Sequence, residues 1–310
     1  MARQRRTSEP LYRQILATGG AALARFKGRV IEVFDVVKPA DLIHALHLAK
    51  NGSKLSPLFA NTCELDLTLE LNAEAAWPQG KWVRQDPTFP EVIFDSEEIT
   101  PTPGIEIKVW FPLTTEITGR FKESVSRFAQ DQTNIAVLAW LPEHILYGKP
   151  VILDVWIDSA RSVAMARDKH YHNPPDYLII EPEDTSARTR NLRQTNTTGY
   201  KFQDTPELLV RAKEVMEQLG IEAEFAFTAE YQRKLKELRS KFTYRSDSNF
   251  SKIDRIGHEG LEAFKTRVLN TTLAGRTINE WRTVFRSAAR SDNARAAING
   301  LIGLRNHGWS

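Results

Sequence analysis

The stretch FPEVIFDSEEITPTPGIEIKVW, Phe89 to Trp110, places charged side chains in two apolar runs. Glu91 and Asp95 stand at the ends of the first run, and Glu106 and Lys108 lie inside the second. The segment between the runs is rich in Pro and Gly and predicts the turn of a β-hairpin. Charged side chains are rarely buried without a partner. This hairpin is therefore the first place to look for a functional site.

Alternation along a strand decides which of these side chains meet. Glu106 and Lys108 share one face of the second strand, because successive side chains of a strand point to opposite faces. On the first strand, Glu91 and Asp95 share a face for the same reason. The two strands run antiparallel through the turn, so we expect Glu91 to lie near Lys108. The pattern predicts that carboxylates and an ammonium group converge at one edge of the sheet.

Converging carboxylates repel one another unless a cation neutralises them. Mg²⁺ does this through a few carboxylate oxygens, and it takes water and phosphate oxygens as its remaining ligands. A neighbouring lysine can orient or help deprotonate an attacking water and can stabilise charge on the phosphate. Together these features predict metal-assisted hydrolysis of a phosphodiester. The alternative interpretation is a structural salt bridge between Glu106 and Lys108 on a solvated strand face.

The segments around the hairpin predict a mixed sheet covered by helices. A helix is expected from Asp41 to Asn51-Gly52, and a strand over CELDLTLEL, residues 63–71, where acidic and apolar residues alternate. A helix over 115–130 and an apolar strand over 134–141 follow, and this order favours parallel neighbouring strands. Two more strands are expected over 150–157 and 176–182. Residues 60–182 therefore predict an α/β fold with a mixed sheet.

Residues 40–182 resemble the core of the PD-(D/E)XK nucleases, and among them the type II restriction endonucleases. The resemblance is carried by Pro90-Glu91, by Glu106-Ile107-Lys108 on the next strand, and by the helix and apolar strand expected after it. The resemblance implies a restriction-endonuclease-like core, with Mg²⁺ held by Glu106 and by Glu91 or Asp95, and Lys108 beside the attacking water. The family's usual Asp after Pro is Glu91 here, whereas Asp95 has the usual type but lacks the proline. Which of the two binds the metal stays open.

Members of the family often recruit a further acid from a preceding helix or strand. The candidates here are Glu64, Asp66 and Glu70 on the predicted strand over 63–71. The alternative is that these three acids form the solvated face of that strand.

The segment Ser186–Lys201 is basic, contains no acidic residue and has no helical or strand periodicity. Arginine suits phosphates and guanine edges, and Asn or Gln suits adenine. The predicted DNA-recognition residues of this loop are Arg188, Arg190, Arg193, Gln194, Asn196 and Lys201. Upstream, His170 and His172 lack an identifiable third zinc ligand, so a DNA contact or plain loop polarity is the favoured interpretation.

Helical patterns run from Thr205 to the end, which predicts a catalytic core over 1–204 and a helical region over 205–310. The tail has Ile278, Trp281, Phe285 and Ala288 at helical spacing. Its basic residues are Arg276, Arg282, Arg286, Arg290, Arg295 and Arg305. They either form a solvated helix face or contact DNA, and the region is expected to dimerise, bind DNA or do both.

Composition narrows the possible classes of protein. No apolar run approaches the roughly 20 residues that span a bilayer, and the basic N-terminal stretch lacks the apolar core of a signal peptide. Cys63 is the one cysteine, so the sequence offers neither an internal disulfide nor a cysteine-based zinc site. A net charge of +3 is weak evidence for a polyanionic partner, and no Gly-rich phosphate loop supports ATP or nicotinamide chemistry. These features predict a cytoplasmic protein.

With the resemblance, these features predict a type II restriction endonuclease, a Mg²⁺-dependent enzyme that cuts both strands of double-stranded DNA at a specific sequence. Cutting two strands of a symmetric site calls for two equivalent active sites, which a homodimer supplies. Two alternatives stay open. One is a non-catalytic, sequence-specific DNA-binding regulator, and the other is a repair or structure-specific nuclease of the same fold.

Overall fold

The computed structural model describes residues 10–303, apart from 75–76, 86–87, 115, 118, 122, 124, 129, 172–177, 183–198, 205, 221–229, 231–232, 235–236, 238–239, 242–244 and 248–251. Backbone contacts divide the chain into two compact units. The sheet unit comprises Met1–Gly119, Ser126–Ser162 and His258–Ser310, and the second unit comprises Arg120–Val125 and Val163–Gly257. The division into a catalytic core over 1–204 and a helical region over 205–310 stays a prediction.

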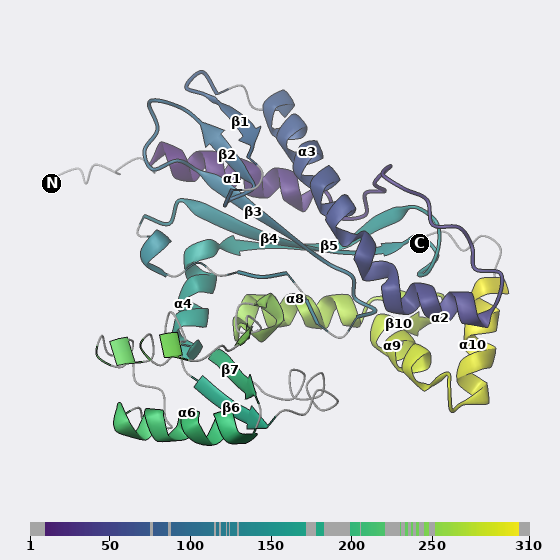
Figure 1. The fold of residues 1–310 in the computed structure, drawn as a ribbon. Coiled ribbons are helices and arrows are strands. Elements are labelled where there is room, and N and C mark those ends of the chain that lie inside the picture. The colour runs from purple at the N-terminus through teal and green to yellow at the C-terminus, as the bar shows by residue number, and fades with distance from the viewer. Residues whose placement is uncertain are drawn as a thin grey trace, which may run out of the picture. The chain divides into compact units, whose positions relative to one another are not determined.

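A five-stranded mixed β-sheet forms the core of the sheet unit (Figure 1). Its strands are, in spatial order, β1 (Lys81–Arg84), β2 (Val92–Asp95), β3 (Gly104–Trp110), β4 (Thr133–Pro142) and β5 (Pro150–Ser159). Strands β3 and β4 run parallel, and the other neighbouring pairs are antiparallel. The predicted α/β class with a mixed sheet is therefore confirmed. The sheet contains the predicted antiparallel pair β2–β3, and β4 lies parallel to β3 as predicted.

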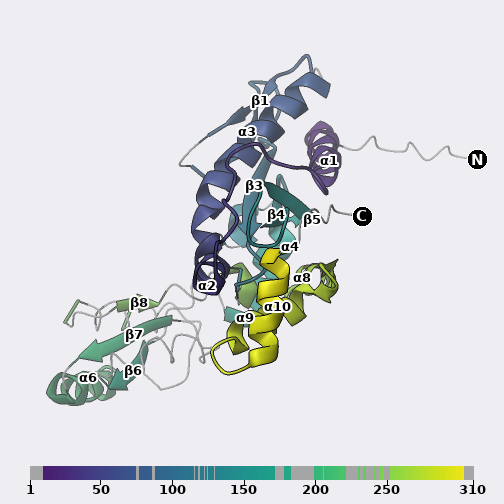
Figure 2. The same cartoon turned by 90° about the vertical axis from the view of Figure 1, so that its right-hand side faces the viewer.

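Helices flank this sheet. Helix α1 (Leu11–Ala24) packs on β3, β4 and β5, α3 (Ser56–Glu74) on β1 and β3, and α8 (Glu259–Leu269) on β5. Helix α2 (Leu42–Asn51) leads through a 3₁₀ turn at Gly52–Leu55 into α3 (Figures 1 and 2). As predicted, Asp41 caps α2, because its Oδ1 accepts a hydrogen bond of 2.8 Å from the backbone N–H of His44. None of the described helices combines the length and hydropathy that crossing a bilayer requires.

The C-terminal part of the sheet unit contains a small hairpin and two helices. Strands β9 (Thr272–Leu273) and β10 (Arg276–Thr277) flank a two-residue turn, where Ala274 and Gly275 both have positive φ. Helices α9 (Ile278–Ser287) and α10 (Asp292–Gly303) follow. The apolar spacing predicted for this tail is confirmed, since Ile278, Trp281 and Ala288 are buried.

The second unit has its own three-stranded sheet. Strand β7 (Gly199–Asp204) lies between β6 (Leu178–Pro182), to which it is parallel, and β8 (Arg245–Asp247), to which it is antiparallel. Helix α6 (Pro206–Gln218) and a 3₁₀ turn at Ile253–Arg255 also belong to this second unit. Helix α4 (Ala160–Tyr171) begins in the sheet unit, and its residues from Val163 onward belong to the second unit. The strand predicted over 176–182 exists, but it belongs to this sheet. Residues 199–204, predicted to be irregular, form a strand.

The strand predicted over residues 63–71 is wrong, because this segment lies inside helix α3. Burial follows a helical repeat, with Cys63, Leu67 and Leu71 fully buried and Leu65 and Leu69 about half exposed. Apolar residues alternate with polar ones over these nine positions, and every second apolar residue (Cys63, Leu67 and Leu71) also recurs at the helical spacing of four. Because Leu and Glu are strong helix formers, the local propensity favours the helix.

The helix predicted over residues 115–130 is also wrong. The described residues of this segment form turns and bends, with one 3₁₀ turn at Val125–Phe128. The side chains expected on its apolar face were those of Ile117, Phe121, Val125 and Phe128. Val125 is partly buried, and the other three are fully buried. Thr and Ile beside Gly119 are poor helix formers, so burial is achieved here without a regular helix.

Candidate active site

The predicted cluster forms where strands β2 and β3 separate. Their register pairs Val92 with Ile105 and Ile93 with Gly104, and the ladder ends before Glu91. The Glu91 carboxylate occupies the space beyond, where its Oε2 accepts a hydrogen bond of 3.1 Å from the backbone N–H of Ile107. This bond satisfies a β3 donor that has no β2 partner at this point. The fork between the strands therefore fixes Glu91 against the middle of β3.

Lys108 joins the two carboxylates. Its Nζ lies 2.7 Å from Oε1 of Glu91 and forms an ion pair with Oε1 of Glu106. The side chains are 18% exposed for Lys108, 22% for Glu91 and 5% for Glu106, so water reaches the cluster from one side. These contacts match the sequence prediction that an ammonium group and carboxylates meet on the hairpin. The roles of the three residues stay predictions.

Glu106 has the most unusual environment of the three. Burial, a hydrogen bond with Glu91 and the negative charge of Glu91 raise the pKa of Glu106 to about 9, against the opposing effect of Lys108. Burial by itself would lower the pKa of Lys108, but the charges of Glu106 and Glu91 raise it above its ordinary value. The cluster therefore keeps an additional proton at neutral pH and holds Lys108 as an ammonium group.

One oxygen of this cluster is open to a ligand. Among the residues that the structure describes, nothing forms a hydrogen bond with the buried Oε2 of Glu106. A buried carboxyl oxygen without a partner is costly, and a divalent cation that displaced the proton of Glu106 would satisfy it. The same described part of the chain contains no set of three His, Cys, Asp or Glu side chains arranged around an ion. Glu91 and Glu106 supply two carboxyl groups, so a hard cation held there would take its other ligands from water and phosphate.

Glu64 approaches the cluster from helix α3. It is buried, and the Nε of Arg84, at the end of β1, donates a hydrogen bond of 2.8 Å to its Oε2. Burial raises the pKa of Glu64 above its usual range, the Arg84 hydrogen bond opposes this, and the charges of Glu91 and Lys108 also act on it. Glu64 is therefore within electrostatic range of Glu91 and Lys108. Of the three further acids predicted on this segment, Glu64 is the one at the site.

The other two acids of that prediction lie elsewhere. Glu70 forms ion pairs with Arg25 and Arg29, at 3.3 and 2.6 Å. Asp66 interacts with Arg29 and Glu70. Glu70 is therefore paired with the segment just after α1, and the charged groups that act on Asp66 are Arg29 and Glu70 rather than the cluster.

The structure does not bring Asp95 to the cluster. Asp95 is exposed at the far end of β2 and faces Lys81 in the register of β1. Four residues of strand separate it from Glu91, or roughly 13 Å at the usual rise. The geometry therefore favours Glu91 over Asp95 as the partner of Glu106, and the expectation that Asp95 shares the site is wrong.

Most of the predicted recognition loop lies outside the described residues. This applies to Arg188, Arg190, Arg193, Gln194 and Asn196, and also to His172 and Arg305. Lys201 lies in β7, and His170 lies in α4. Their part in DNA recognition stays a prediction.

Sequence reasoning missed Arg84, because the short strand β1 was not predicted. Its guanidinium also donates to Oδ1 of Asn61, so it links β1 to α3 at two points beside the cluster. The available signal was WVR after Gly80, an apolar pair that ends in a cation. Arg84 is the second cation, after Lys108, that the structure places near the carboxylates.

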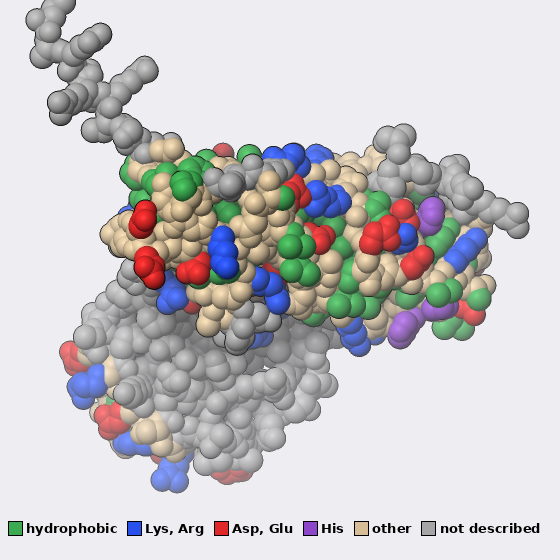
Figure 3. All heavy atoms as spheres, turned by 90° about the horizontal axis from the view of Figure 1, so that it is seen from above, with side chains coloured by type: hydrophobic (Ala, Val, Ile, Leu, Met, Phe, Trp, Pro, Cys, Tyr) green, Lys and Arg blue, Asp and Glu red, His purple; other side chains and the backbone are tan. Residues whose placement is uncertain are grey.

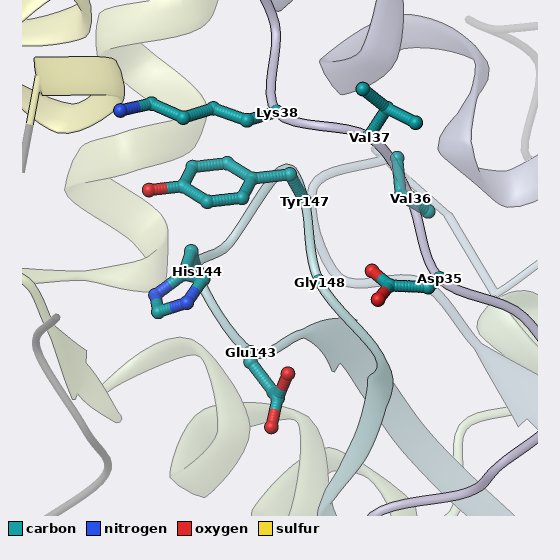
Figure 4. A pocket seen from close by; sticks show the side chains of 8 residues that line it. All are labelled: Asp35, Val36, Val37, Lys38, Glu143, His144, Tyr147 and Gly148. Atoms are coloured by element: carbon teal, nitrogen blue, oxygen red, sulfur yellow. The ribbon is translucent and has the colours of Figure 1, made fainter. Parts of the chain in front are cut away.

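The structure also shows a shallow hollow of about 490 Å³ away from these residues (Figure 4). The segment before α2 forms one side with Asp35 and Lys38, and the β4–β5 hairpin forms the other with His144 and Tyr147. Nζ of Lys38 lies 5.8 Å from the centroid of the Tyr147 ring, and the His144 and Tyr147 rings are 4.6 Å apart. These contacts tie the segment to the hairpin, and none of the predicted catalytic residues lines the hollow.

Comparisons of the chain with family models, with curated proteins and with solved structures give no match.

Proposed function

We propose that the protein is a Mg²⁺-dependent endonuclease of the PD-(D/E)XK type that cuts double-stranded DNA as a type II restriction enzyme. The observation that carries the proposal is the contact of Lys108 Nζ with both Glu91 and Glu106 at the fork of β2 and β3. The buried Oε2 of Glu106 has no hydrogen-bond partner among the described residues, and it adds a position for a cation. Pro90-Glu91 and Glu106-Ile107-Lys108, which carry the resemblance in the sequence, thus meet in one place.

Each residue has a distinct task in this proposal. Glu91 and Glu106 would hold the metal, and Glu64 would add negative charge to the same site from α3. The bound metal would supply Lewis acidity toward the scissile phosphate and lower the pKa of a bound water. Lys108 is held as an ammonium group, so it donates hydrogen bonds, orients the attacking water and stabilises negative charge on the phosphate. The backbone N–H of Ile107 keeps Glu91 in place.

The test of this chemistry is plasmid digestion in Mg²⁺ with matched variants. We expect wild-type protein to give discrete fragments, and Lys108→Ala and Glu106→Gln to reduce the cleavage rate by about 100-fold or more. Asp95→Asn is the control, because it changes an exposed carboxylate on the neighbouring strand β2, outside the cluster. Cleavage by Lys108→Ala at the wild-type rate would rule out the assigned site.

Fragment mapping separates the restriction enzyme from the repair or structure-specific nuclease. A restriction enzyme gives the same ends in every copy of one short palindromic sequence. A structure-specific nuclease cuts at branches, ends or damaged positions without such a common sequence. Sequenced fragment ends from one plasmid decide between them.

A second candidate function has one observation in its favour. Both carboxylates already contact Lys108, which is also the arrangement of a structural ion pair. In a non-catalytic DNA-binding regulator, the protein would bind a specific sequence without cutting it in Mg²⁺ or Mn²⁺. Glu106→Gln would then change stability but leave DNA affinity unchanged.

A further inference from the structure

The solvent-facing side of α9 is basic. Five residues on this side are exposed: Arg276, just before the helix, Asn279, Thr283, Arg286 and Arg290. Asn279, Thr283 and Arg286 follow one another at intervals of four and three residues, so they lie along one face of α9. Arg276 and Arg290 flank the two ends of the helix. The opposite side of the helix is buried through Ile278 and Trp281. We call the five exposed residues the α9 stripe.

Charge is concentrated at this place. Residues 276–290 contain four arginines and one glutamate, which gives this stretch a formal charge of +3. The whole chain also has a formal charge of +3, so all other residues together sum to zero. On the face seen from above in Figure 3, acidic and basic side chains of the coloured residues are intermixed. The segment of α9 is therefore one of the local concentrations of positive charge in the chain.

The arginines of the stripe differ from several others in the sheet unit. Arg25 and Arg29 pair with Glu70, Arg267 pairs with Asp154, and Arg295 pairs with Asp292. Within the described part of the chain, Arg286 and Arg290 have no ion-pair partner. The acid on α9, Glu280, accepts hydrogen bonds from the backbone N–H and the hydroxyl of Thr277, which lower its pKa. Its carboxylate is thus committed to capping the helix.

The helix that displays the stripe is firmly held. Thr277 and Glu280 form a reciprocal capping box at its start. Nε1 of Trp281 donates a hydrogen bond of 2.8 Å to the carbonyl of Leu273, which ties α9 to the β9–β10 hairpin, and α10 packs beside the helix. Side chains on a rigid element lose less entropy on binding than those on a loose segment.

We infer that the α9 stripe binds the phosphate backbone of double-stranded DNA, with α9 lying along the major groove. At the helical rise, Arg286 lies about 12 Å along the axis from the start of α9, beside Arg276. Phosphates follow one another along each wall of the groove, so cations at the two ends of the stripe suit successive phosphates of one strand. Asn279 and Thr283, between them, face base edges. The inference deepens the proposed function by naming the element that grips the substrate, but it concerns binding alone.

The test is binding of a fluorescently labelled duplex of about 25 base pairs, measured by anisotropy in EDTA so that no metal-dependent cleavage occurs. We expect the double variant Arg286→Gln/Arg290→Gln to weaken binding about tenfold or more in low salt. The slope of log K against log salt concentration should become shallower by about 2, since each phosphate contact contributes about 0.9. Arg286→Lys/Arg290→Lys keeps the charge and should restore most of the slope.

The control is Arg25→Gln, which removes one arginine from the end of α1 while Arg29 still holds Glu70. It should leave affinity and slope unchanged. Circular dichroism melting checks that each variant is folded. A wild-type slope in the double Gln variant would overturn the inference, and so would wild-type protein that fails to bind the duplex. Equal affinity for the single strand would overturn the placement of α9 in the groove.

The outcomes for binding and for cleavage are independent. If the double Gln variant loses affinity while Glu106→Gln digests plasmid like wild type, the stripe is supported and the proposed active site fails. If Glu106→Gln abolishes cleavage while the double Gln variant keeps the wild-type slope, the active site is supported and the stripe is not the contact.

Discussion

A single buried carboxyl makes the stability of the metal-free protein depend on pH. The pKa of Glu106 is about 9 in the folded state, above its ordinary value of 4.5, because burial disfavours the charged form. The folded state therefore binds more protons than the unfolded state between these two values. Stability is highest at the acidic end of this window and falls as the pH rises through it, by up to about 1.4 kcal/mol per pH unit from this one group.

Urea unfolding in EDTA between pH 6 and 9 measures this slope. Glu106→Gln cannot ionise, so we expect its unfolding free energy to fall less steeply with pH than that of wild type. Asp95→Asn, with the exposed carboxylate, should retain the wild-type slope. Equal slopes for wild type and Glu106→Gln would show that the carboxyl does not carry the proton in the folded state.

The same proton should compete with a metal ion at Glu106. Mg²⁺ binds the ionised carboxylate, so its binding must release the proton, and its affinity should rise with pH. We expect Mg²⁺ to raise the melting temperature of wild type, and to raise it more at pH 8.5 than at pH 6.5. Glu91→Gln and Glu106→Gln should show little shift, whereas Asp95→Asn should behave like wild type. A shift of equal size in Glu106→Gln would place the ion elsewhere.

At the scale of single elements, the sequence predicts the hairpin and the strands β4 and β5 well. Their apolar runs and turn residues admit one interpretation, and the contacts among Glu91, Glu106 and Lys108 follow from strand alternation. The segment around Glu64 was predicted wrongly, because nine residues of alternating apolar and polar type fit a strand and also place Cys63, Leu67 and Leu71 at helical spacing. Sequence alone could not place Arg84 or exclude Asp95, since both depend on which strands pair and where the pairing ends.

The fork of β2 and β3 depends on a close approach at Gly104. A Cβ added there would lie 2.4 Å from Cγ of Pro90, which precedes the catalytic candidate Glu91. We expect Gly104→Ala to push Pro90 and Glu91 outward, to cost about 1 to 3 kcal/mol of stability and to reduce cleavage more than substrate affinity. Gly300→Ala, in α10 with no atom near its added Cβ, is the control and should be neutral or stabilising. Unchanged activity in a folded Gly104→Ala protein would mean that the fork tolerates displacement of Glu91.

At the scale of the whole molecule, three separate stretches of chain build the sheet unit. The C-terminal segment returns to the sheet through contacts such as that between Trp110 and Phe264, whose rings are 6.1 Å apart. Periodicity describes neighbouring residues, so it could not indicate that residues 258–303 pack with the strands. The α9 stripe and the carboxylate cluster therefore belong to one compact unit, although about 170 residues separate Glu106 from Asn279.

Under the proposed function, the cluster of Glu91, Glu106 and Lys108 would hydrolyse one strand at a time, so a double-strand cut at a symmetric site would require two chains related by a two-fold axis. We expect purified protein to sediment as a dimer when bound to its site. Mixed dimers of wild type and Lys108→Ala, co-expressed with different tags and purified through both, should convert supercoiled plasmid mainly to nicked circles. Wild-type dimers treated alike should give linear product, because both strands are cut in one encounter. Linear product at the wild-type rate from the mixed dimers would show that one site cuts both strands, and the two-fold arrangement would then be wrong.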